Sequence, residues 1–590
     1  MPSHSYILTL AIFLPLVGAL AIALLPREAD RRIRVVALVF SLLTFALTLG
    51  LIFGFDRTAA GFQWVEEYAW IASPPIHYHL GIDGLSLILV VLTGFLTPLC
   101  VLASWTGITD RVKEFHILLL ALETGVIGVF LSLDLFLFFV FWEVMLIPMY
   151  FLIGIWGHGR KVYAAVKFIL FTMVGSALML VGIIFLYERT GTFDYPKILT
   201  ALSSGAVPLS HTTETLLFWA FLLAFAIKVP LFPLHTWLPD AHTEAPTAGS
   251  VILAGVLLKM GTYGMLRFCL PLFPESSREF ATLLSVLAVI GILYGALVSM
   301  VQPDLKRLVA YSSVAHLGFV VLGIFAFNLE GAEGAIYQMV SHGVSTGALF
   351  LMVGMLYDRR HTRLIKDFGG LGTTMPVFST LFMIVTLSSL GLPLLNGFVG
   401  EFLIILGSFH ARALFGSLAA VGVILAAVYL LWMYQRVFLG EVTDEKNRAI
   451  SDCNLREKVI LISAVAVIIL MGVYPQPFLR QMDSSVSQVL GRVNPAAASA
   501  QVTRPGPSAH PTGPVAGPLR DCADGEAPRC AEPEVLREGL NGARLNPALP
   551  GSASELSRSA ASRARRVPEL IGVILAAPAA TTPADGGRKR

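Results

Sequence analysis

The chain has 590 residues, of which 55% are apolar and only 14% are charged, and its formal net charge is +3. A soluble globular protein carries about 25% charged residues, so this composition excludes that class and indicates a protein that crosses a membrane many times. The bilayer is therefore its first expected partner. The small net charge gives no sign of a nucleic-acid partner, and none is expected.

Apolar segments of about 20 residues, the length that crosses ~30 Å of hydrocarbon, follow one another along the chain. About fourteen are predicted, at 6–25, 33–55, 83–105, 114–133, 134–156, 164–187, 215–238, 246–268, 279–300, 304–327, 333–357, 374–412, 413–436 and 458–476. We therefore expect an all-α polytopic membrane protein.

Five parts follow from this map. They are an N-terminal three-span region (1–113), a first five-span set (114–270), a second five-span set (271–440), a last span with its flanks (441–492) and a C-terminal tail (493–590). The tail is rich in Pro, Ala, Gly and Arg and shows no sustained periodicity, so it is predicted to be disordered. A further hypothesis is that the tail is not native coding sequence.

Two of the predicted spans contain helix-breaking residues. The twelfth, 374–412, is too long for one straight span and contains Gly391, Pro393 and Asn396, so it is expected to break in mid-membrane. The seventh carries Pro230 and Pro233 and is the second candidate. A break at membrane depth is tolerated where it lines a cavity or is buried in protein, as in secondary transporters.

Lysine and arginine are distributed unevenly between the loops. The odd-numbered loops carry nineteen, and the even-numbered loops carry five, namely Arg57, Arg189, Lys197, Arg278 and Arg412. By the positive-inside rule the odd-numbered loops face the cytoplasm, and both ends of the fourteen-span core face away from it.

Five titratable residues lie near the middle of five separate spans. They are Glu143, Lys228, Lys259, His316 and Glu401. Left unpaired in the bilayer, they would cost roughly 12 kcal/mol by insertion values. One Glu–Lys pair or one histidine could be structural, but a structural set could be replaced by apolar residues at little loss. A proton relay is the function that this set indicates, with Glu143 near Lys228 as the switch.

Weaker candidates surround the relay. Glu123 lies within the fourth span, His235 and His242 flank the TWLPDAH stretch, and His342 lies in QMVSHGVSTG. Each is either a further relay member or a group that caps or packs a helix.

The two five-span sets suggest an inverted repeat. Because five is odd, spans 4–8 and 9–13 would cross the bilayer in opposite directions. Glu143 and His316 are 173 residues apart, and so are Lys228 and Glu401. The prolines of the two breaks do not keep that spacing, so insertions blur the register.

Four motifs carry a family resemblance. FWEVMLIPMYFLIGIWG (141–157), AIKVPLFPLHTWLPDAHTEAPTAGSVILAGVLLKMGTYGMLRF (226–268), DLKRLVAYSSVAHLGF (304–319) and GLPLLNGFVGEF (391–402) resemble the antiporter-like membrane subunits of respiratory complex I. Within this family, the subunit L and subunit N types and the Mrp antiporter proteins usually carry lysine on the broken twelfth helix. Glu401 instead resembles the subunit M type, the bacterial counterpart of mitochondrial subunit four. The resemblance covers about 1–490.

The resemblance implies a proton-translocating module of NADH:quinone oxidoreductase in a bacterial inner membrane. It implies L-type and N-type antiporter-like neighbours, with NADH, FMN, iron–sulfur clusters and quinone held by partner subunits. It also pairs Glu143 with Lys228 and continues the relay through Lys259, His316 and Glu401. The sequence has no C-x-x-C spacing, phosphate loop or credible dinucleotide motif, so no cofactor or metal is expected in this chain.

Three other functions remain open at this point. The chain could be an Mrp-type cation/proton antiporter subunit, although Glu401 argues against it. It could be a module of a membrane hydrogenase or of a formate-oxidising complex. It could also be a passive scaffold, against which the five midplane charges argue.

Overall fold

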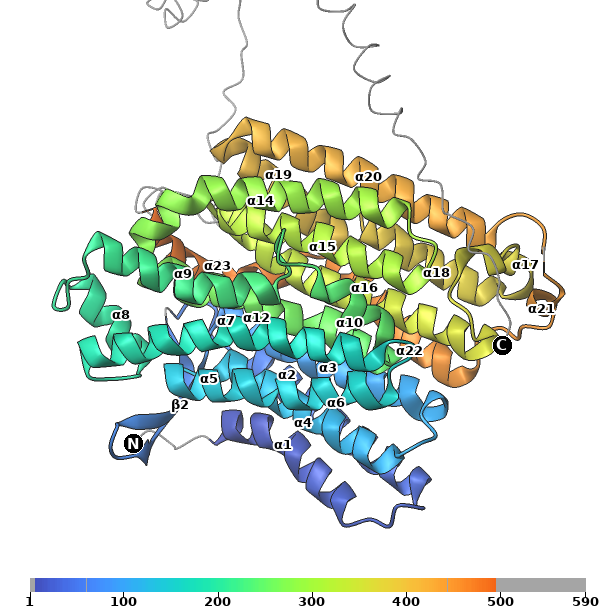
Figure 1. Ribbon diagram of the computed structural model, residues 1–590, viewed down its shortest axis with the longest axis horizontal. Helices are drawn as coiled ribbons and strands as arrows, with labels where there is room; N and C mark the ends of the chain where they lie inside the picture. Colours follow the sequence, from blue (N-terminus) through green and yellow to red (C-terminus); the bar gives the residue numbers. More distant parts are fainter. Residues whose placement is uncertain (1–5, 60, 443, 495–590) are drawn as a thin grey trace, which may run out of the picture. The chain divides into compact units, whose positions relative to one another are not determined.

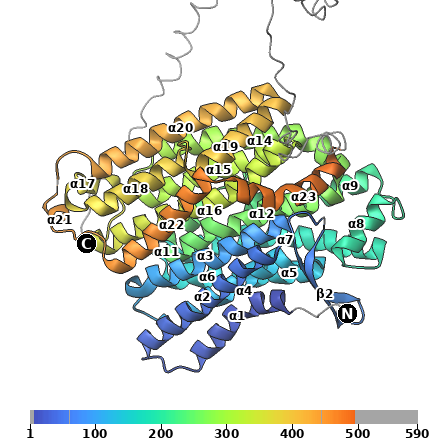
Figure 2. The same ribbon diagram turned by 180° about the vertical axis from the view of Figure 1, so that it is seen from behind.

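The computed structural model describes residues 6–59, 61–442 and 444–494 (Figure 1). The predicted disordered tail lies outside these residues, apart from its first two positions. In the described part, helices pack side by side along most of their length, and the same arrangement is seen from behind (Figure 2).

The described chain is mostly helical. Its helices and strands are, in order, α1 (Ile7–Ala23), α2 (Asp30–Gly54), β1 (Gln63–Ile71), β2 (Ile76–Ile82), α3 (Gly84–Gly107), α4 (Val112–Leu131), α5 (Leu135–Val144), α6 (Leu146–Trp156), α7 (Lys161–Thr190), α8 (Tyr195–Ser203), α9 (His211–Lys228), α10 (Trp237–Glu244), α11 (Thr247–Ile252), η1 (Leu253–Leu257), α12 (Leu258–Gly264), η2 (Met265–Cys269), α13 (Leu270–Leu272), α14 (Pro274–Met300), α15 (Leu305–Ile324), α16 (Leu329–Arg360), η3 (Ile365–Asp367), α17 (Leu371–Thr374), α18 (Pro376–Ser389), α19 (Asn396–Ala411), α20 (Ala413–Phe438), α21 (Glu445–Arg448), α22 (Leu455–Val473) and α23 (Gln476–Val493).

Among the described residues, ten helices are long and apolar enough to cross a membrane. The bent pair α22–α23 raises this number to eleven, and α1 and α18 are shorter apolar helices. The chain is thus a multi-pass membrane protein with about ten or eleven apolar spanning helices. Helix α15 packs closely against both α14 and α16, while α16 packs on α19 and α14 packs on α20.

The predicted break of the twelfth span is present between α18 and α19. The helix stops at Ser389, and Gly391 and Leu394 then adopt positive φ angles of +80° and +73°. Glycine is suited to this conformation at Gly391, where a Cβ atom would lie 2.8 Å from Oε2 of Glu401. The break therefore brings backbone against the Glu401 carboxylate.

The predicted disruption of the seventh span is also present. Helix α9 ends at Lys228, and the chain makes turns until α10 begins at Trp237. The indole N–H of Trp237 donates to the Ile227 carbonyl oxygen at 2.8 Å, which satisfies one carbonyl of the broken helix end. Lys228 is therefore the last residue of a helix that ends inside the protein.

The eighth span is continuous but not uniformly α-helical. From Ala248 to Leu272 it is fully buried, and two π-helical turns, η1 and η2, flank the α-helical segment that carries Lys259. Such π turns are rare in proteins, and those that do occur are frequently found at functional sites. Their presence here was not predicted.

The all-α expectation was wrong between α2 and α3. Strands β1 and β2 form an antiparallel hairpin there. The buried Glu66 carboxylate of β1 accepts backbone N–H groups of Leu8 at 2.8 Å and Thr9 at 3.1 Å. These are donors at the first turn of α1, so the hairpin fixes where the first helix begins.

A further helix, α23, occupies the region that was expected to be only a flank of the last span. It bends by 70° from α22 and packs on α3 and α16 (Figure 2). Gly84 at the start of α3 permits this approach, because a Cβ atom there would lie 2.0 Å from the Gln481 carbonyl oxygen. The Gly84 N–H donates to the Ser485 hydroxyl at 3.0 Å, which holds α23 in place.

Candidate functional site: a buried line of titratable side chains

Four buried titratable side chains form one continuous line in the bundle. The Lys259 ammonium lies 2.7 Å from Nδ1 of His342. The rings of His342 and His316 are 5.6 Å apart between centroids, and His316 Nδ1 lies 2.9 Å from Oε1 of Glu401. All four are at most 3% exposed. Three of the five predicted relay residues are thus brought together, with His342, a weaker candidate, as the bridge between them.

Helix α16 supplies a residue that sequence reasoning missed. Gln338 donates from Nε2 to Oε1 of Glu401 at 3.0 Å, so that oxygen accepts from α16 and contacts His316 on α15. Gln338 and His342 are four residues apart and therefore share one face of α16. That spacing was visible in the sequence and is the signal that could have found Gln338.

The broken helix is fixed by a polar cluster beside the line. Oδ1 of Asn396 accepts from the hydroxyls of Ser388 at 2.5 Å and Ser345 at 3.2 Å, and the backbone carbonyl of Asn396 accepts from Ser341 at 3.0 Å. A cavity of about 10 Å³ lies between this cluster and the two histidines. The wall of the break is therefore polar, as expected where irregular backbone lies at membrane depth.

Lys228 and Glu143 lie close together but are not paired in this structure. Lys228 is 1% exposed, and its ammonium lies 3.7 Å from Sδ of Met145 and 5.3 Å from the ring of Trp142. It is within electrostatic range of Glu143. No carboxylate oxygen of the described chain lies within 4.0 Å of it. Glu143 is only part-buried, and its Oε1 has no hydrogen-bond partner among the described residues.

The other secondary candidates are buried but have fewer contacts. Within the described chain, neither ring nitrogen of His242 nor either carboxylate oxygen of Glu123 has a hydrogen-bond partner. His242 stacks on Phe350 at 4.7 Å, and His235 lies between the rings of Phe232 and Tyr294. The structure thus does not connect Glu123, His235 or His242 to the line by hydrogen bonds.

His242 is nevertheless near both the line and another buried lysine, Lys306. It is within electrostatic range of Lys259 and of Lys306, whose ammonium donates to the Ala245 carbonyl oxygen. Residues 246–248 then line a cavity of about 990 Å³ among loops predicted to face the cytoplasm. His158 also lines this cavity, and burial, with Lys306 and Arg363 nearby, lowers its pKa to about 4. Lys306 was not among the predicted site residues.

Comparison with known proteins decides the family. The profile described as "NADH:quinone oxidoreductase/Mrp antiporter, TM" matches residues 132–426, and that described as "NADH-ubiquinone oxidoreductase chain 4, amino terminus" matches 10–128. The NADH-quinone oxidoreductase subunit M of Rhodobacter capsulatus is 47% identical over 496 residues, which cover 82% of this chain and 96% of the relative. The chain belongs to the subunit M family of NADH-quinone oxidoreductases.

Solved structures agree with this assignment. A chain of respiratory complex I from Thermus thermophilus with bound NADH is 34% identical, with a TM-score of 0.74, and the match covers 82% of this chain and all of that one. A chain of the Mrp complex from Dietzia sp. DQ12-45-1b shares the fold, with a TM-score of 0.71 at 22% identity and coverage of 85% and 99%. The resemblance to the subunit M type, expected from four motifs, is confirmed.

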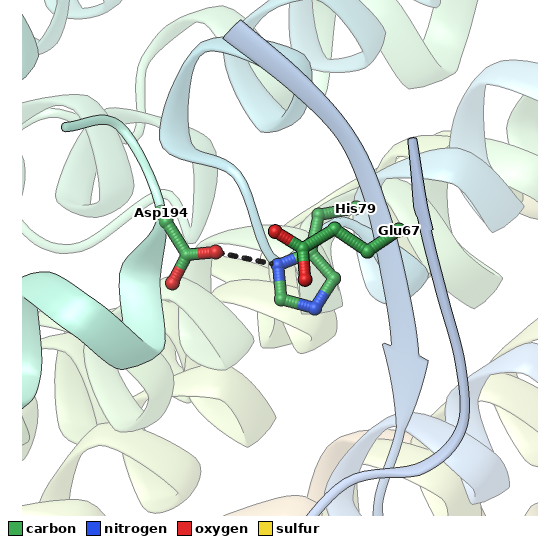
Figure 3. Close-up of side chains that lie close together, drawn as sticks. All are labelled: Glu67, His79 and Asp194. Carbon is green, nitrogen blue, oxygen red and sulfur yellow. Dashed lines mark hydrogen bonds and ion pairs between the residues drawn. The ribbon is translucent and has the colours of Figure 1, made fainter. Parts of the chain in front are cut away.

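A second cluster of titratable groups in this chain lies outside the line. Figure 3 shows Glu67 and His79 of the hairpin facing Asp194, with His79 Nδ1 2.8 Å from Oδ2 of Asp194. The Lys197 ammonium lies 3.2 Å from Glu67 and 3.4 Å from Asp194. The chain's own lysine therefore supplies the cation that this carboxylate pair needs, and the cluster joins the hairpin to α8.

Asp194 is expected to stabilise the fold in a pH-dependent way. Burial alone would raise its pKa, but contacts with His79 and the Lys197 backbone N–H outweigh burial, and the pKa lies below its usual value. Its contribution is therefore present above about pH 4 and lost as pH falls through the lower folded-state pKa. Asp194→Asn should lower stability by about 1–3 kcal/mol at pH 7 and by less near pH 3.

Thermal melting of the purified protein in detergent at the two pH values measures this difference. Glu188→Gln, which removes a carboxylate from an exposed position, is the matched control. An equal loss of stability at pH 7 and pH 3 would contradict the expectation.

Proposed function

We propose that this chain is a proton-translocating membrane-arm subunit of NADH:quinone oxidoreductase. Two observations support the proposal, namely its membership of the subunit M family and the buried line Lys259–His342–His316–Glu401. NADH, FMN, iron–sulfur clusters and quinone would be held by partner subunits. L-type and N-type subunits would be its neighbours in a bacterial inner membrane.

The line has the chemistry of a proton relay. A lysine ammonium can release a proton to an imidazole nitrogen 2.7 Å away, and the second imidazole can exchange one with a carboxylate at 2.9 Å. Transfer between the two rings, whose centroids are 5.6 Å apart, needs a ring movement or a bridging water. Gln338 holds the acceptor oxygen of Glu401 in place.

Lys228 and Glu143 would act as the switch. With no carboxylate of the described chain within 4.0 Å, the buried ammonium would release a proton more readily than when it is paired. Approach of Glu143 would favour the charged form and hold the proton. A distant redox event that moves α5 relative to the end of α9 would thereby change the proton affinity of Lys228.

The fourteen-span arrangement with two inverted five-helix repeats belongs to the same proposal. In each predicted repeat the fourth span is broken, α9–α10 in one and α18–α19 in the other. Each break lies beside a buried charge, Lys228 or Glu401. Broken helices in corresponding positions are typical of transporters built on this plan.

Uptake would occur through the cavity of about 990 Å³ on the predicted cytoplasmic side. Lys306 donates to the Ala245 carbonyl next to that cavity, and His242, within electrostatic range of both Lys306 and Lys259, would connect the cavity to the line. A neutral His158 on the cavity wall leaves an acceptor nitrogen free, since its Nδ1 has no partner among the described residues.

Purification of the complex through a tag on this chain tests the function. The chain should co-purify with NADH-oxidising activity, and vesicles containing the complex should acidify when NADH and quinone are added. Lys228→Ala should reduce acidification at least about tenfold. Wild-type pumping by an intact Lys228→Ala complex would refute the relay, and cation/proton exchange without NADH would favour an Mrp-type antiporter instead.

A further inference from the structure

A cavity of about 300 Å³ lies away from the line of titratable groups, where four helices begin or end. Helices α14 and α20 begin there, and α15 and α19 end there. The three helices α14, α19 and α20 lie side by side (Figure 1). Two of the four, α14 and α20, are apolar spanning helices that begin here, so the cavity lies at a boundary of the membrane, on the side predicted to face away from the cytoplasm.

Among the residues that the structure describes, two arginines line this cavity and no acidic residue does. Arg278 and Arg412 are two of only five lysines and arginines in the even-numbered loops. Neither guanidinium has a carboxylate within 4.0 Å in the described part of the chain. Arg278 donates from Nη1 to the Val493 carbonyl oxygen at 3.1 Å, which leaves its other N–H groups available. Two positive charges therefore face one cavity without a counter-charge.

A buried hydroxyl on the cavity wall is also without a partner. Ser408 on α19 is 2% exposed, and its Oγ has no hydrogen-bond partner among the residues that the structure describes. Burial of a polar group without a partner is unfavourable, so such groups are rare unless something else occupies the site. Ser408 thus points to a bound polar group in the same cavity as the arginines.

The remaining walls and the nearby surface are apolar. Leu322, Phe325 and Phe415 line the cavity, and Phe409 and Leu414 beside it are 50% and 66% exposed. Large apolar side chains with this exposure at the ends of spanning helices are suited to contact with lipid acyl chains.

We propose that this cavity binds the phosphate of an anionic membrane phospholipid. Arg278 and Arg412 would donate to the phosphate oxygens, Ser408 would complete the set of donors, and the acyl chains would lie on the apolar surface around Phe409 and Leu414. Arginine is the side chain best suited to bidentate contact with phosphate, and two arginines at one cavity can hold one phosphate group. This inference does not depend on the proposed relay.

Titration of the purified, delipidated full-length chain in detergent tests the site. Thermal melting is followed while dioleoylphosphatidylglycerol or zwitterionic dioleoylphosphatidylcholine is added. We expect phosphatidylglycerol to raise the melting temperature at lower concentration than phosphatidylcholine. The double variant Arg278→Gln/Arg412→Gln should shift the midpoint of the phosphatidylglycerol titration about thirtyfold upward, and Ser408→Ala about threefold.

A matched control removes the same charge elsewhere. Arg57→Gln/Arg189→Gln takes two exposed arginines from the same set of loops and should leave the titration unchanged. Melting without lipid shows whether each variant is folded. If a variant does not fold, Arg278→Lys/Arg412→Lys, which keeps the charge but loses bidentate contact, replaces it and should shift the midpoint by a smaller factor.

Three results would overturn the proposal. An equal shift in the control variant would show that only net charge matters. An equal rise in melting temperature with inorganic phosphate alone would assign the cavity to a free anion. Binding by a chain that ends at Asn494, which lines the cavity, but not by the full chain would assign it to the residues that follow.

Discussion

Replacement of Lys259 by methionine should reduce NADH-driven proton pumping at least about tenfold, because positioned proton-transfer groups contribute factors of about 10²–10⁴. Methionine fills a similar volume but has no proton to give to His342, so the line would be interrupted at its start. Acidification of vesicles that contain the purified complex measures the effect, relative to the NADH-oxidising activity of the same preparation.

Two controls separate proton transfer from charge and from structure. Lys259→Arg keeps a positive charge beside His342, but an arginine cannot release its proton at neutral pH. It should therefore reduce proton pumping almost as much as Lys259→Met. Lys366→Met removes an exposed lysine from a loop and should have no effect. Pumping at the wild-type rate by a fully assembled Lys259→Met complex would show that the line does not carry protons.

Glu401→Gln should also reduce pumping at least about tenfold, while leaving the break of the helix intact. Glutamine preserves the size of the side chain and can still accept from Gln338 through its carbonyl oxygen, but it cannot take up a proton from His316. The expected result is a complex that assembles and still contains the chain but translocates fewer protons per NADH oxidised.

Variants of Gln338, which contacts Glu401, and of an exposed glutamate serve as comparisons for Glu401→Gln. Gln338→Leu removes the donor to Oε1 and leaves the carboxylate, so it should lower pumping by a smaller factor, about two- to tenfold, and shift its pH profile. Glu188→Gln, at an exposed position, should behave as wild type. Equal pumping by Glu401→Gln and wild type would remove Glu401 from the relay.

Hydropathy and charge were enough to predict much of the fold, because a bilayer constrains a helix strongly. Each helix needs about 20 apolar residues, and any charge within it has to be accounted for. For the same reason, Lys228, Lys259, His316 and Glu401 could be selected from the sequence, and glycine and proline marked the breaks at Lys228 and near Gly391. Helices shorter than a full span, such as α1 and α18, were the hardest to count.

Which buried groups touch was not readable from the sequence. From the sequence, His342 was no stronger a candidate for the relay than His235 or His242. In the structure, it alone of the three lies within hydrogen-bond distance of Lys259. The rotation of α16 about its axis decides this, and packing against neighbouring helices sets that rotation. The hairpin was also missed, because its first strand is mostly exposed and its pairing is interrupted by irregular register.

The sequence by itself determined that this chain is a membrane protein with buried charges of both signs and two broken helices, because each of those features is costly in lipid and therefore conspicuous. Only the tertiary structure decided that Lys259, His342, His316 and Glu401 form one line, and that no carboxylate of the described residues lies within 4.0 Å of the Lys228 ammonium. The physical reason is distance. Hydrogen bonds and ion pairs act over about 3–4 Å, and contacts between residues some 60 to 85 positions apart depend on how helices cross, which no local pattern specifies.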